Sequence, residues 1–460
     1  MTQHKNKSVL VLGLGETGLS MVRWLSTQSA RLRVADSRSA PPGLAQAARY
    51  VAAEQIFCGN FNDALFDGIE LIAISPGVPL RDPVVARAIA RGIEVVGDIE
   101  LFAQSLPKDN RPHILAITGA NGKTTVTSMV EHLCKAAGKD AVAAGNISPA
   151  VLDVVLERGA NQPEVWVLEL SSFQLETTSS LNADAATVLN ISEDHLDRYA
   201  DMAEYSAAKA RIFAGCGIQV LNRDDARCMS MARAECKTIT FGLNMPETES
   251  DFGIERAHGE IWLMQGKQRL IKASELQVVG LHNVANALAA LALGRAINFP
   301  MHTLLDALRS FKGLPHRVER VAEMDGITYY DDSKGTNVGA TIAALQGLGC
   351  KAVLIAGGEG KGQDFAPLNP VAARHARAVV LIGRDAPLIE KALNGSGVKV
   401  VHAGDMGDAV QQAAQLAQNG DAVLLSPACA SFDMFRNYEH RAEVFVQAVQ
   451  ELEREGAWHP

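Results

Sequence analysis

A glycine-rich segment followed by lysine and threonine lies at residues 117–125 and could bind the phosphates of a nucleotide. It reads Ile-Thr-Gly-Ala-Asn-Gly-Lys-Thr-Thr, between an apolar run at 113–117 that predicts a buried strand and an apolar-periodic stretch at 126–137 that predicts a helix. Backbone N–H groups at such a helix start attract an anion, Lys123 adds charge, and a threonine hydroxyl can reach Mg²⁺. The usual pattern has glycine where this chain has Ile117, so the motif is a shortened form, and a chance Gly-Lys-Thr loop is the alternative.

A second glycine pattern, Gly13-Leu-Gly-Glu-Thr-Gly18, follows a predicted strand at 8–12 and opens a predicted helix that runs to about Leu25. Asp36 follows 18 residues after Gly18, at the end of another predicted strand. This arrangement is typical of NAD or FAD binding, but the same turn can hold any nucleotide diphosphate, including that of a UDP-sugar. The segment Ser-Pro-Gly-Val-Pro at 75–79 follows the next strand and is either a ligand loop or a plain turn.

Metal-binding side chains follow two strands of the central region. Glu169 ends the predicted strand 165–169, where a carboxylate would face a ligand and could hold Mg²⁺, unless it is simply solvated. The strand 185–189 is followed by Asn-Ile-Ser-Glu-Asp-His-Leu-Asp at 190–197, whose oxygen and imidazole donors indicate a metal or phosphate site. Lys209 lies in a predicted helix among small residues, and taken alone it would be a solvated lysine.

The last third of the chain alternates strands and helices. Three of the strands are followed by loops whose side chains could take part in binding or catalysis. These loops cover residues 331–337, 357–362 and 426–433. Glycine-rich turns are often structural, but three of them at strand ends favour a binding edge of a mainly parallel sheet. Before this region, 260–271 predicts a β-hairpin, and the amides of 280–286 either cap a helix or read an adenine edge.

Length and composition are those of a globular α/β protein of about three domains. A proline-flanked segment at 107–112 and a boundary at 311–317 divide the chain into 1–108, 109–313 and 314–460. We expect a Rossmann-like N-terminal domain, a P-loop-type central domain with a small antiparallel patch, and a Rossmann-like C-terminal domain. The net charge of −9 argues against a nucleic-acid or membrane-surface binder. The seven scattered cysteines without C-x-x-C, and the absence of any run of 18 apolar residues, predict a cytoplasmic protein without a membrane span.

Taken together, the motifs resemble the Mur ligase family, the ATP-dependent amide-forming enzymes of peptidoglycan precursor synthesis. The resemblance covers essentially the whole chain and is carried by long literal matches. The shared motifs are residues 118–125, 190–195, 280–286 and 316–317, and the long literal matches are residues 169–176, 194–199 and 424–431. It implies ligation of D-glutamate to UDP-N-acetylmuramoyl-L-alanine through an acyl phosphate, with ATP as co-substrate, two Mg²⁺ ions, no nucleic-acid partner and a monomeric chain.

The resemblance also implies a role for individual residues. Lys123, Glu169, His195 and Lys209 would be catalytic, with Thr124 and Glu169 holding one Mg²⁺, and His195 and an N-carbamylated Lys209 serving the second. The ATP contacts would be Gly119, Asn121, Gly122, Lys123, Thr124, Thr125, Asn283, Asn286, His316, Arg317, Asp332 and Lys334. The first domain would bind UDP, the UDP-substrate contacts being Gly15, Glu16, Thr17, Asp36, Arg38, Ser75, Gly77, Asn146, Ser171 and Gln174. The last domain would bind D-glutamate through Thr336, Lys361, Ser431 and Tyr438, the last standing where we expect phenylalanine.

Three alternatives remain at this stage. Another ligase of the same fold, such as a folylpolyglutamate synthase, would share the phosphate loop. An NAD(P)-dependent oxidoreductase would explain residues 13–18 but not Lys123, Glu169 or the third domain. A non-catalytic nucleotide-binding module would leave the clustered metal donors without a role.

Overall fold

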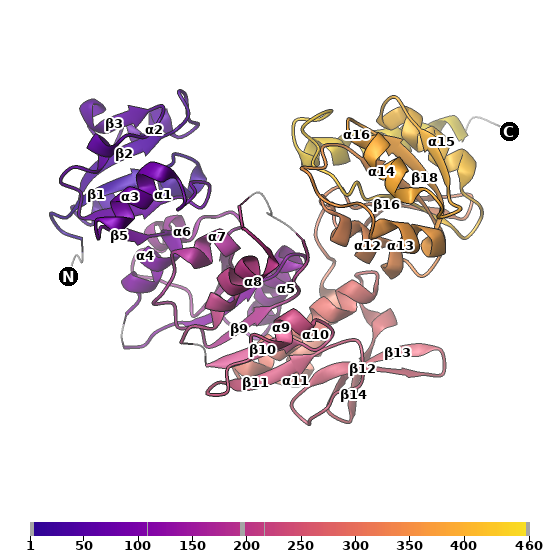
Figure 1. Cartoon of the computed structure of the whole chain (residues 1–460). Coiled ribbons are helices and arrows are strands. Elements are labelled where there is room, and N and C mark those ends of the chain that lie inside the picture. The colour runs from indigo at the N-terminus through magenta and orange to yellow at the C-terminus, as the bar shows by residue number, and fades with distance from the viewer. Residues whose placement is uncertain (1–3, 108, 194–197, 216, 457–460) are drawn as a thin grey trace.

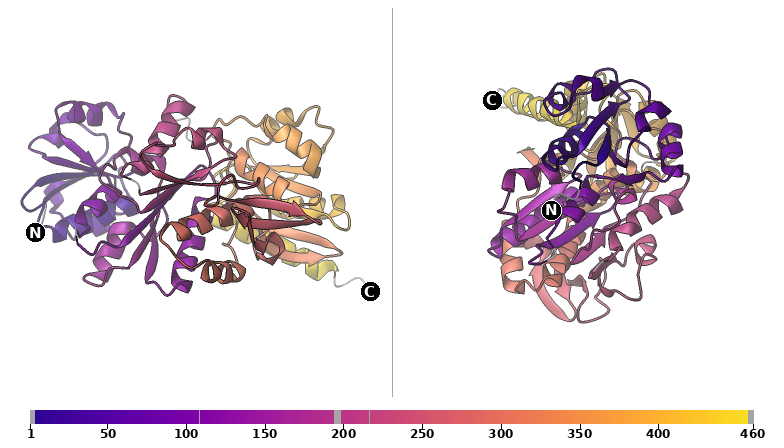
Figure 2. Two further views of the ribbon diagram at one scale, coloured as in Figure 1. Left: turned by 90° about the horizontal axis from the view of Figure 1, so that it is seen from below. Right: turned by 90° about the vertical axis from the view of Figure 1, so that its left-hand side faces the viewer.

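The computed structural model describes residues 4–107, 109–193, 198–215 and 217–456. Three α/β bodies, each built on its own sheet, follow one another along the chain (Figure 1). The second body lies between the first and the third (Figure 2). The predicted fold class of three α/β domains is confirmed; the boundaries at 108 and 313 stay predictions.

The N-terminal sheet is parallel, with strand order β3-β2-β1-β4-β5. Its strands are β1 (Ser8–Leu12), β2 (Arg31–Asp36), β3 (Ile56–Cys58), β4 (Leu71–Ile74) and β5 (Glu94–Val96). Its helices are α1 (Glu16–Thr27), α2 (Leu44–Ala47) and α3 (Pro83–Ala90). The apolar residues of β1 and β4 are buried on both faces, as parallel strands covered by helices require. Because β1 and β4 are neighbours and their connections leave in opposite directions, the loops after them form the crevice in which such sheets bind ligands.

The N-terminal body shares its hydrophobic core with the central body. Helix α4 (Asp98–Ser105) follows β5 and packs beside α6 (Val151–Arg158). The Phe102 and Trp166 rings meet edge to face, with centroids 4.8 Å apart. Arg23 of α1 donates to Asp153 of α6, with Nε 2.9 Å from Oδ1. Apolar burial of this kind is the dominant stabilising contribution in proteins, so these two bodies are docked against each other.

The central sheet has nine strands in the order β14-β13-β12-β11-β10-β9-β6-β8-β7. The strands are β6 (His113–Thr118), β7 (Ala141–Gly145), β8 (Val165–Glu169), β9 (Ala185–Val188), β10 (Ile218–Asn222), β11 (Lys237–Phe241), β12 (Phe252–Ala257), β13 (Glu260–Gln265) and β14 (Gln268–Lys272). The helices are α5 (Lys123–Ala136), α7 (Ser172–Glu176), α8 (Met202–Ala210), α9 (Ala226–Met229), α10 (Leu281–Ala296) and α11 (Met301–Ser310), besides α6. The predicted hairpin is confirmed as β13–β14. It is joined to the parallel strands through β12, which sequence patterning misses, so the antiparallel patch continues the main sheet.

The C-terminal sheet has the order β15-β16-β20-β17-β18-β19. Its strands are β15 (Glu319–Met324), β16 (Ile327–Asp331), β17 (Ala352–Gly357), β18 (Ala376–Ile382), β19 (Lys399–His402) and β20 (Ala422–Leu425). Its helices are α12 (Val338–Gly347), α13 (Leu368–His375), α14 (Ala386–Leu393), α15 (Met406–Leu416) and α16 (Tyr438–Gly456). The sheet is parallel except for the edge strand β15, which the sequence does not reveal because only part of it is buried. Its two apolar cores are separate from those of the other bodies.

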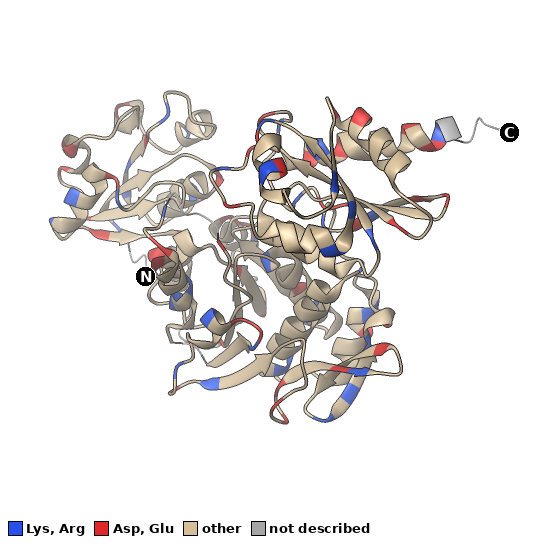
Figure 3. Cartoon of the chain, turned by 45° about the vertical axis from the view of Figure 1, so that its right-hand side comes forward, with Lys and Arg blue, Asp and Glu red and all other residues tan. Residues whose placement is uncertain are grey.

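Surface charge and cysteine placement agree with the composition. Lysine and arginine are interspersed with aspartate and glutamate over all three bodies in the view of Figure 3. Cys134, Cys228 and Cys429 are buried, whereas Cys58 is exposed. Among the described residues, no helix has the length and apolarity needed to cross a membrane.

Candidate active site

The phosphate loop connects β6 to α5, as predicted, but the helix begins at Lys123, three residues before the apolar periodicity does. Gly122 caps α5 with a φ of +82°, a conformation that glycine adopts at little cost. A Cβ at this position would lie 2.7 Å from Oδ1 of Asn286, because α10 packs against the loop. Lys123, Thr124 and Thr125 therefore form the first helical turn, where backbone N–H groups lack helical acceptors and can bind phosphate.

The loop is held by Asn190, which follows β9. The backbone N–H of Asn121 donates to Asn190 Oδ1 at 2.8 Å, and Asn190 Nδ2 donates to the Asn121 carbonyl at 3.0 Å. The backbone of Ala120 donates to the Asn190 carbonyl at 2.9 Å. Because β9 is a neighbour of β6, Asn190 holds the loop by three hydrogen bonds, two through its side-chain amide and one through its backbone carbonyl.

Two lysines from different helices converge on the phosphate loop. Lys123 Nζ donates to the carbonyls of Gly119 and Ala120, both at 2.9 Å. Lys209 Nζ donates to the Gly119 carbonyl at 3.0 Å and to Thr118 Oγ1 at 3.3 Å, and lies 4.8 Å from the centroid of the Tyr205 ring. Lys209 is 2% exposed, so the alternative of a solvated helix lysine is wrong.

Glu169 ends β8, the other neighbour of β6, and lies beside the phosphate loop. Its side chain is buried. Oε1 accepts a 2.8 Å hydrogen bond from Asn146 Nδ2, while Oε2 is buried without a hydrogen-bond partner among the described residues. A buried carboxylate oxygen without a partner is costly unless a cation compensates it, so this donor fits Mg²⁺. His195 lies outside the described residues, as do the other donors at 194–197.

Cations from the third body and its linker face the same region. Arg317 lies in the linker between α11 and β15, and Lys334 follows β16. Burial lowers the pKa of Lys334, and the positive charges of Arg317 and Lys123 lower it further. Burial also lowers the pKa of Arg317, which the carboxylates of Glu169 and Asp332 oppose. Arg317 and Lys334 line one cavity together with Asn121 and Thr125 of the central body, so two bodies of the chain contribute to one charged centre.

A cavity of about 330 Å³ lies next to this centre, between α10, the phosphate loop and α12. Its lining includes Asn121, Thr125, Asn283, Asn286, Arg317, Asp332 and Lys334. Asn283 Nδ2 donates to the Val279 carbonyl at 2.8 Å, and Asn286 Nδ2 donates to Asn283 Oδ1 at 3.0 Å. Neither amide caps α10, whose start has no side-chain cap, so the capping alternative is wrong and both groups face the cavity. Burial raises the pKa of Asp332 to about 7, although Ser426 Oγ donates to it.

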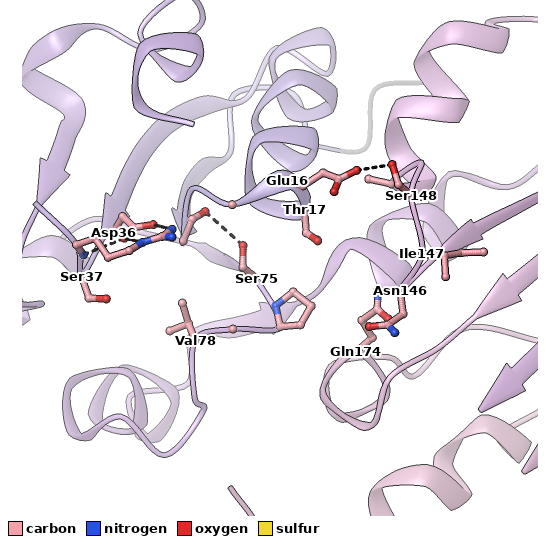
Figure 4. A pocket seen from close by; sticks show the side chains of 17 residues that line it. Glu16, Thr17, Asp36, Ser37, Ser75, Val78, Asn146, Ile147, Ser148 and Gln174 are labelled. Atoms are coloured by element: carbon pink, nitrogen blue, oxygen red, sulfur yellow. Dashed lines mark hydrogen bonds and ion pairs between the residues drawn. The ribbon is translucent and has the colours of Figure 1, made fainter. Parts of the chain in front are cut away.

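A second cavity, of about 500 Å³, lies between the N-terminal and central bodies (Figure 4). Glycines 13 and 15, Glu16, Thr17, Asp36, Arg38, Ser75 and Gly77 line one side, and Asn146, Ser148 and Gln174 line the other. Ser148 Oγ donates to Glu16 Oε1 across the opening at 2.8 Å. Ser171 lies next to the cavity, where its hydroxyl accepts from the Gln174 N–H at 3.1 Å and completes a capping box for α7.

Asp36 is saturated by hydrogen bonds within the protein. Oδ2 accepts from the Leu14 N–H at 2.6 Å and from Arg38 Nη2 at 2.7 Å, and Oδ1 accepts from Arg38 N and Nε, both at 2.9 Å. Burial alone would raise the pKa of Asp36, but the Arg38 and Leu14 hydrogen bonds outweigh it and lower the pKa to about 2. A carboxylate with all its acceptor positions occupied cannot also receive a ribose 2′-hydroxyl, the contact that the dinucleotide interpretation requires.

The three loops of the C-terminal body meet because β16, β20 and β17 are adjacent. Glu359 and Ala430 form an antiparallel bridge, which places the loops carrying Lys361 and Ser431 side by side. Ser431 is buried, and Lys361 Nζ lies 5.9 Å from the centroid of the Phe432 ring. Lys334 Nζ lies 3.7 Å above the Tyr438 ring. Thr336 lies in the first of these loops, two residues before α12 begins. The three loops therefore lie at one edge of the sheet, and Lys334 connects this edge to the charged centre.

The sequence matches three domain families over most of its length. Residues 7–97 match the MurD-like N-terminal domain of Mur ligases, 117–294 the Mur ligase middle domain, and 316–429 the Mur ligase glutamate ligase domain. The chain belongs to the Mur ligase family. Curated relatives named UDP-N-acetylmuramoylalanine--D-glutamate ligase include that of Nitrosomonas europaea, 56% identical, with 98% of both chains covered. Another, from Methylobacillus flagellatus, is 58% identical, with 99% of both chains covered.

Solved structures of Mur ligase type share the fold at low sequence identity. A pseudomurein peptide ligase type C from Methanothermus fervidus superimposes with a TM-score of 0.60 at 19% identity, covering 97% of this chain and all of the other. The UDP-N-acetylmuramate-alanine ligase MurC of Thermotoga maritima gives 0.59 at 20% identity, covering 96% and 99%. Similarity at this level supports the three-domain Mur ligase architecture.

Some residues of this Mur ligase site escape sequence reasoning. Asn190 was visible only as part of a donor cluster, not as the group that holds the phosphate loop. Asn337 Nδ2 donates to Asn121 Oδ1 at 3.1 Å, linking the third body to the loop, and Ser148 faces Glu16 across the cavity between the N-terminal and central bodies. The two residues in each of these contacts are more than 60 positions apart in the sequence, so no local sequence pattern indicates which residues pair.

Proposed function

We propose that this chain is an ATP-dependent ligase that joins D-glutamate to UDP-N-acetylmuramoyl-L-alanine in cytoplasmic peptidoglycan precursor synthesis, acting as a monomer. The proposal is supported by the name that the curated relatives share. It is also supported by the side chains that surround one centre, which come from the phosphate loop, from the end of β8 and from the third body with its linker. The observation that carries it is the convergence of Lys123, Arg317 and Lys334 beside the orphaned oxygen of Glu169. Such a centre suits a phosphate that must approach a carboxylate.

Activation of the substrate carboxylate is the first step of the proposed reaction. The alanyl carboxylate attacks the γ-phosphorus of ATP, the bond to the β-phosphate oxygen breaks, and an acyl phosphate and ADP result. Both reactants are negatively charged, so Lys123 and Lys334 would lower the barrier by offsetting their repulsion. When bound, Mg²⁺ supplies further positive charge at the phosphate oxygens. Thr124 and Glu169 would hold one ion, and His195 and Lys209 would serve a second.

Amide formation follows at the carboxyl carbon of the alanyl group, which now carries the phosphate. The neutral amine of D-glutamate attacks the acyl carbonyl, inorganic phosphate leaves with the electron pair of the C–O bond, and the proton that the amine loses passes to that phosphate. Thr336, Lys361 and Ser431 would bind the carboxylates of D-glutamate, for which a cation and hydroxyl groups are suited. Tyr438 would line the same pocket, with its phenol as an additional polar group. Holding all three substrates in one cleft makes each step effectively intramolecular.

In this proposal the two cavities bind the nucleotide parts of the two substrates, ATP in one and the UDP moiety in the other. Asn283 and Asn286 would read the adenine edge of ATP, and the loops at 13–17 and 75–77 would hold the uracil and diphosphate of the UDP substrate. Asn146 and Gln174, on the central side of that cavity, would face the sugar. The linker at 311–317 would act as a hinge that lets the third body close over ATP and substrate.

Lys209 would act as a carbamate. A protonated lysine has no lone pair for Mg²⁺, whereas a carbamate offers negatively charged oxygens, and it forms only from the neutral amine. The buried position and the small neighbours Ala207, Ala208 and Ala210 would leave room for it. Replacement of Lys209 by alanine would abolish turnover, with partial recovery in short carboxylic acids that supply the missing oxygens. Absence of recovery would contradict the carbamate while leaving a metal-site role intact.

An amino-acid panel tests the function. Phosphate release from ATP is measured with Mg²⁺ and UDP-N-acetylmuramoyl-L-alanine while D-glutamate, L-glutamate, L-lysine or a folate is added in turn. We expect release only with D-glutamate, and with all three substrates present. Equal stimulation by the other amino acids, or by a folate in place of the UDP substrate, would overturn the assignment and favour another ligase of the fold.

A further inference from the structure

We propose that Arg198 is a positioning residue that sets the separation between the two walls of the UDP-substrate cavity. The inference rests on the proposed function, because that function assigns the cavity of Figure 4 to the UDP substrate. Arg198 does not line this cavity. It lies behind both walls and contacts each of them.

The wall of the N-terminal body is held through backbone carbonyls. Arg198 Nη1 donates to the Pro76 carbonyl at 2.9 Å, and Nη2 donates to the Val78 carbonyl at 3.2 Å. Gly77, between these two residues, lines the cavity. The start of the same turn is tied to the glycine loop, since Ser75 Oγ donates to the Gly13 carbonyl at 3.3 Å. The guanidinium therefore holds the turn at residues 76 and 78, and Ser75 holds its start to the glycine loop.

The wall of the central body is held through helix α7. The Arg198 guanidinium carbon lies 4.2 Å from the centroid of the Phe173 ring, and Nη2 lies 3.8 Å from Glu176 Oε2. These two residues flank Gln174, which lines the cavity from the central side and is fixed by its hydrogen bonds to Ser171 and Asp98. One planar cation thus spans from the turn at Pro76 and Val78 to the helix that presents Gln174.

The contacts require the geometry of arginine. A guanidinium can donate to two carbonyls in its plane while its face lies on an aromatic ring, whereas a lysine ammonium can satisfy only part of this set. The Arg198 side chain is 14% exposed, so its charge is little screened by water. It borders a neighbouring cavity of about 540 Å³, through which a small cation could reach the position.

Arg81 offers a matched control. It also joins the two bodies, through an ion pair with Glu204 on α8, but its side chain is 60% exposed and that of Glu204 is 40% exposed. Exposed pairs contribute little, so removing Arg81 should leave the cavity unchanged. Comparison of Arg198→Ala and Arg198→Lys with Arg81→Ala separates positioning from a general interdomain charge effect.

Steady-state kinetics of the full chain, with each substrate varied in turn, test the inference. For Arg198→Ala we expect the KM for UDP-N-acetylmuramoyl-L-alanine to rise at least about tenfold, which is what the loss of one net charge-assisted hydrogen bond would produce. The KM values for ATP and D-glutamate should stay within about twofold of the wild type. Millimolar guanidinium chloride, but not sodium chloride, should lower the raised KM, and Arg198→Lys should be intermediate. Hydrogen exchange of the peptide containing residues 75–80 should accelerate.

Three outcomes would overturn the inference: an unchanged KM for the UDP substrate, equal effects on all three KM values, or an equal effect of Arg81→Ala. If Arg198→Ala does not fold, the Arg198→Lys kinetics and exchange decide. A wild-type chain without activity on the UDP substrate would instead refute the proposed function. The exchange experiment would still report whether Arg198 holds the turn.

Discussion

Replacing Asp36 by asparagine should lower the free energy of unfolding by about 2 kcal/mol at pH 7. The carboxylate accepts hydrogen bonds from Leu14 and Arg38, and these lower its pKa from the ordinary 3.8 to about 2. A pKa difference of this size between the folded and unfolded chain corresponds to about 2 kcal/mol. Asparagine keeps the shape but not the charge, and its amide nitrogen cannot accept the hydrogen bonds that one of the two carboxylate oxygens receives.

The sign of the pH dependence follows from the lowered pKa. A folded pKa below the unfolded value stabilises the protein at every pH above 3.8, and the contribution is lost as the pH falls toward 2. The difference between wild type and Asp36→Asn should therefore be largest at pH 5–7 and about half as large at pH 3. Urea unfolding followed by circular dichroism at several pH values measures it, and other carboxylates cancel because both chains share them.

Asp63 provides the control for this prediction. It makes a similar two-pronged contact with Arg87 in the same body, with Nε 3.0 Å from Oδ1 and Nη2 2.9 Å from Oδ2, but both side chains are more than half exposed. Asp63→Asn should cost much less free energy of unfolding than Asp36→Asn, because the exposed ion pair is screened by water. The reasoning is refuted if Asp36→Asn is as stable as the wild type at pH 7, if its deficit persists unchanged at pH 3, or if the two substitutions cost the same.

Three further substitutions test other parts of the structure. Glu169→Gln should reduce phosphate release by at least about a thousandfold without lowering the melting temperature, because it removes the charge that faces the cation site while keeping the side-chain shape; activity within tenfold of the wild type would contradict the role. Arg441→Met should destabilise the C-terminal body by about 3 kcal/mol, since the buried guanidinium donates to Ser333 and Cys429. In denaturant unfolding the exposed Arg436→Met is its control, and equal midpoints would contradict the prediction. Gly122→Ala should raise the KM for ATP at least about tenfold, because the new Cβ would meet Asn286. Gly138→Ala, at a similar φ of +75° in open space, should leave that KM unchanged, and equal KM values in the two variants would sink the argument.

Motifs whose chemistry is local were predictable from the sequence. The phosphate loop, Glu169 at the end of its strand and the three loops of the C-terminal body were found because strand and helix periodicity places them at element ends. Carboxyl ends of parallel strands share one edge, so the sequence also implied that these groups face a ligand. The sequence does not indicate which partner each polar side chain binds. In the structure, Ser171 caps α7, and Asp36 accepts its hydrogen bonds from Leu14 and Arg38.

The pairing of distant segments was decided only by the tertiary structure. Whether β6 lies between β8 and β9, and hence whether Glu169 and Asn190 flank the phosphate loop, depends on strand order, which side-chain periodicity does not encode. Arg198 directly follows the donor-rich segment at 190–197 in the central body. Its hydrogen-bond partners Pro76 and Val78 nevertheless belong to the N-terminal body. The sequence by itself determined a phosphate loop, a nucleotide-binding crevice and the family that combines them. The width and electrostatics of the site come from long-range packing, because burial and hydrogen bonding act between segments that have no local relation in the chain.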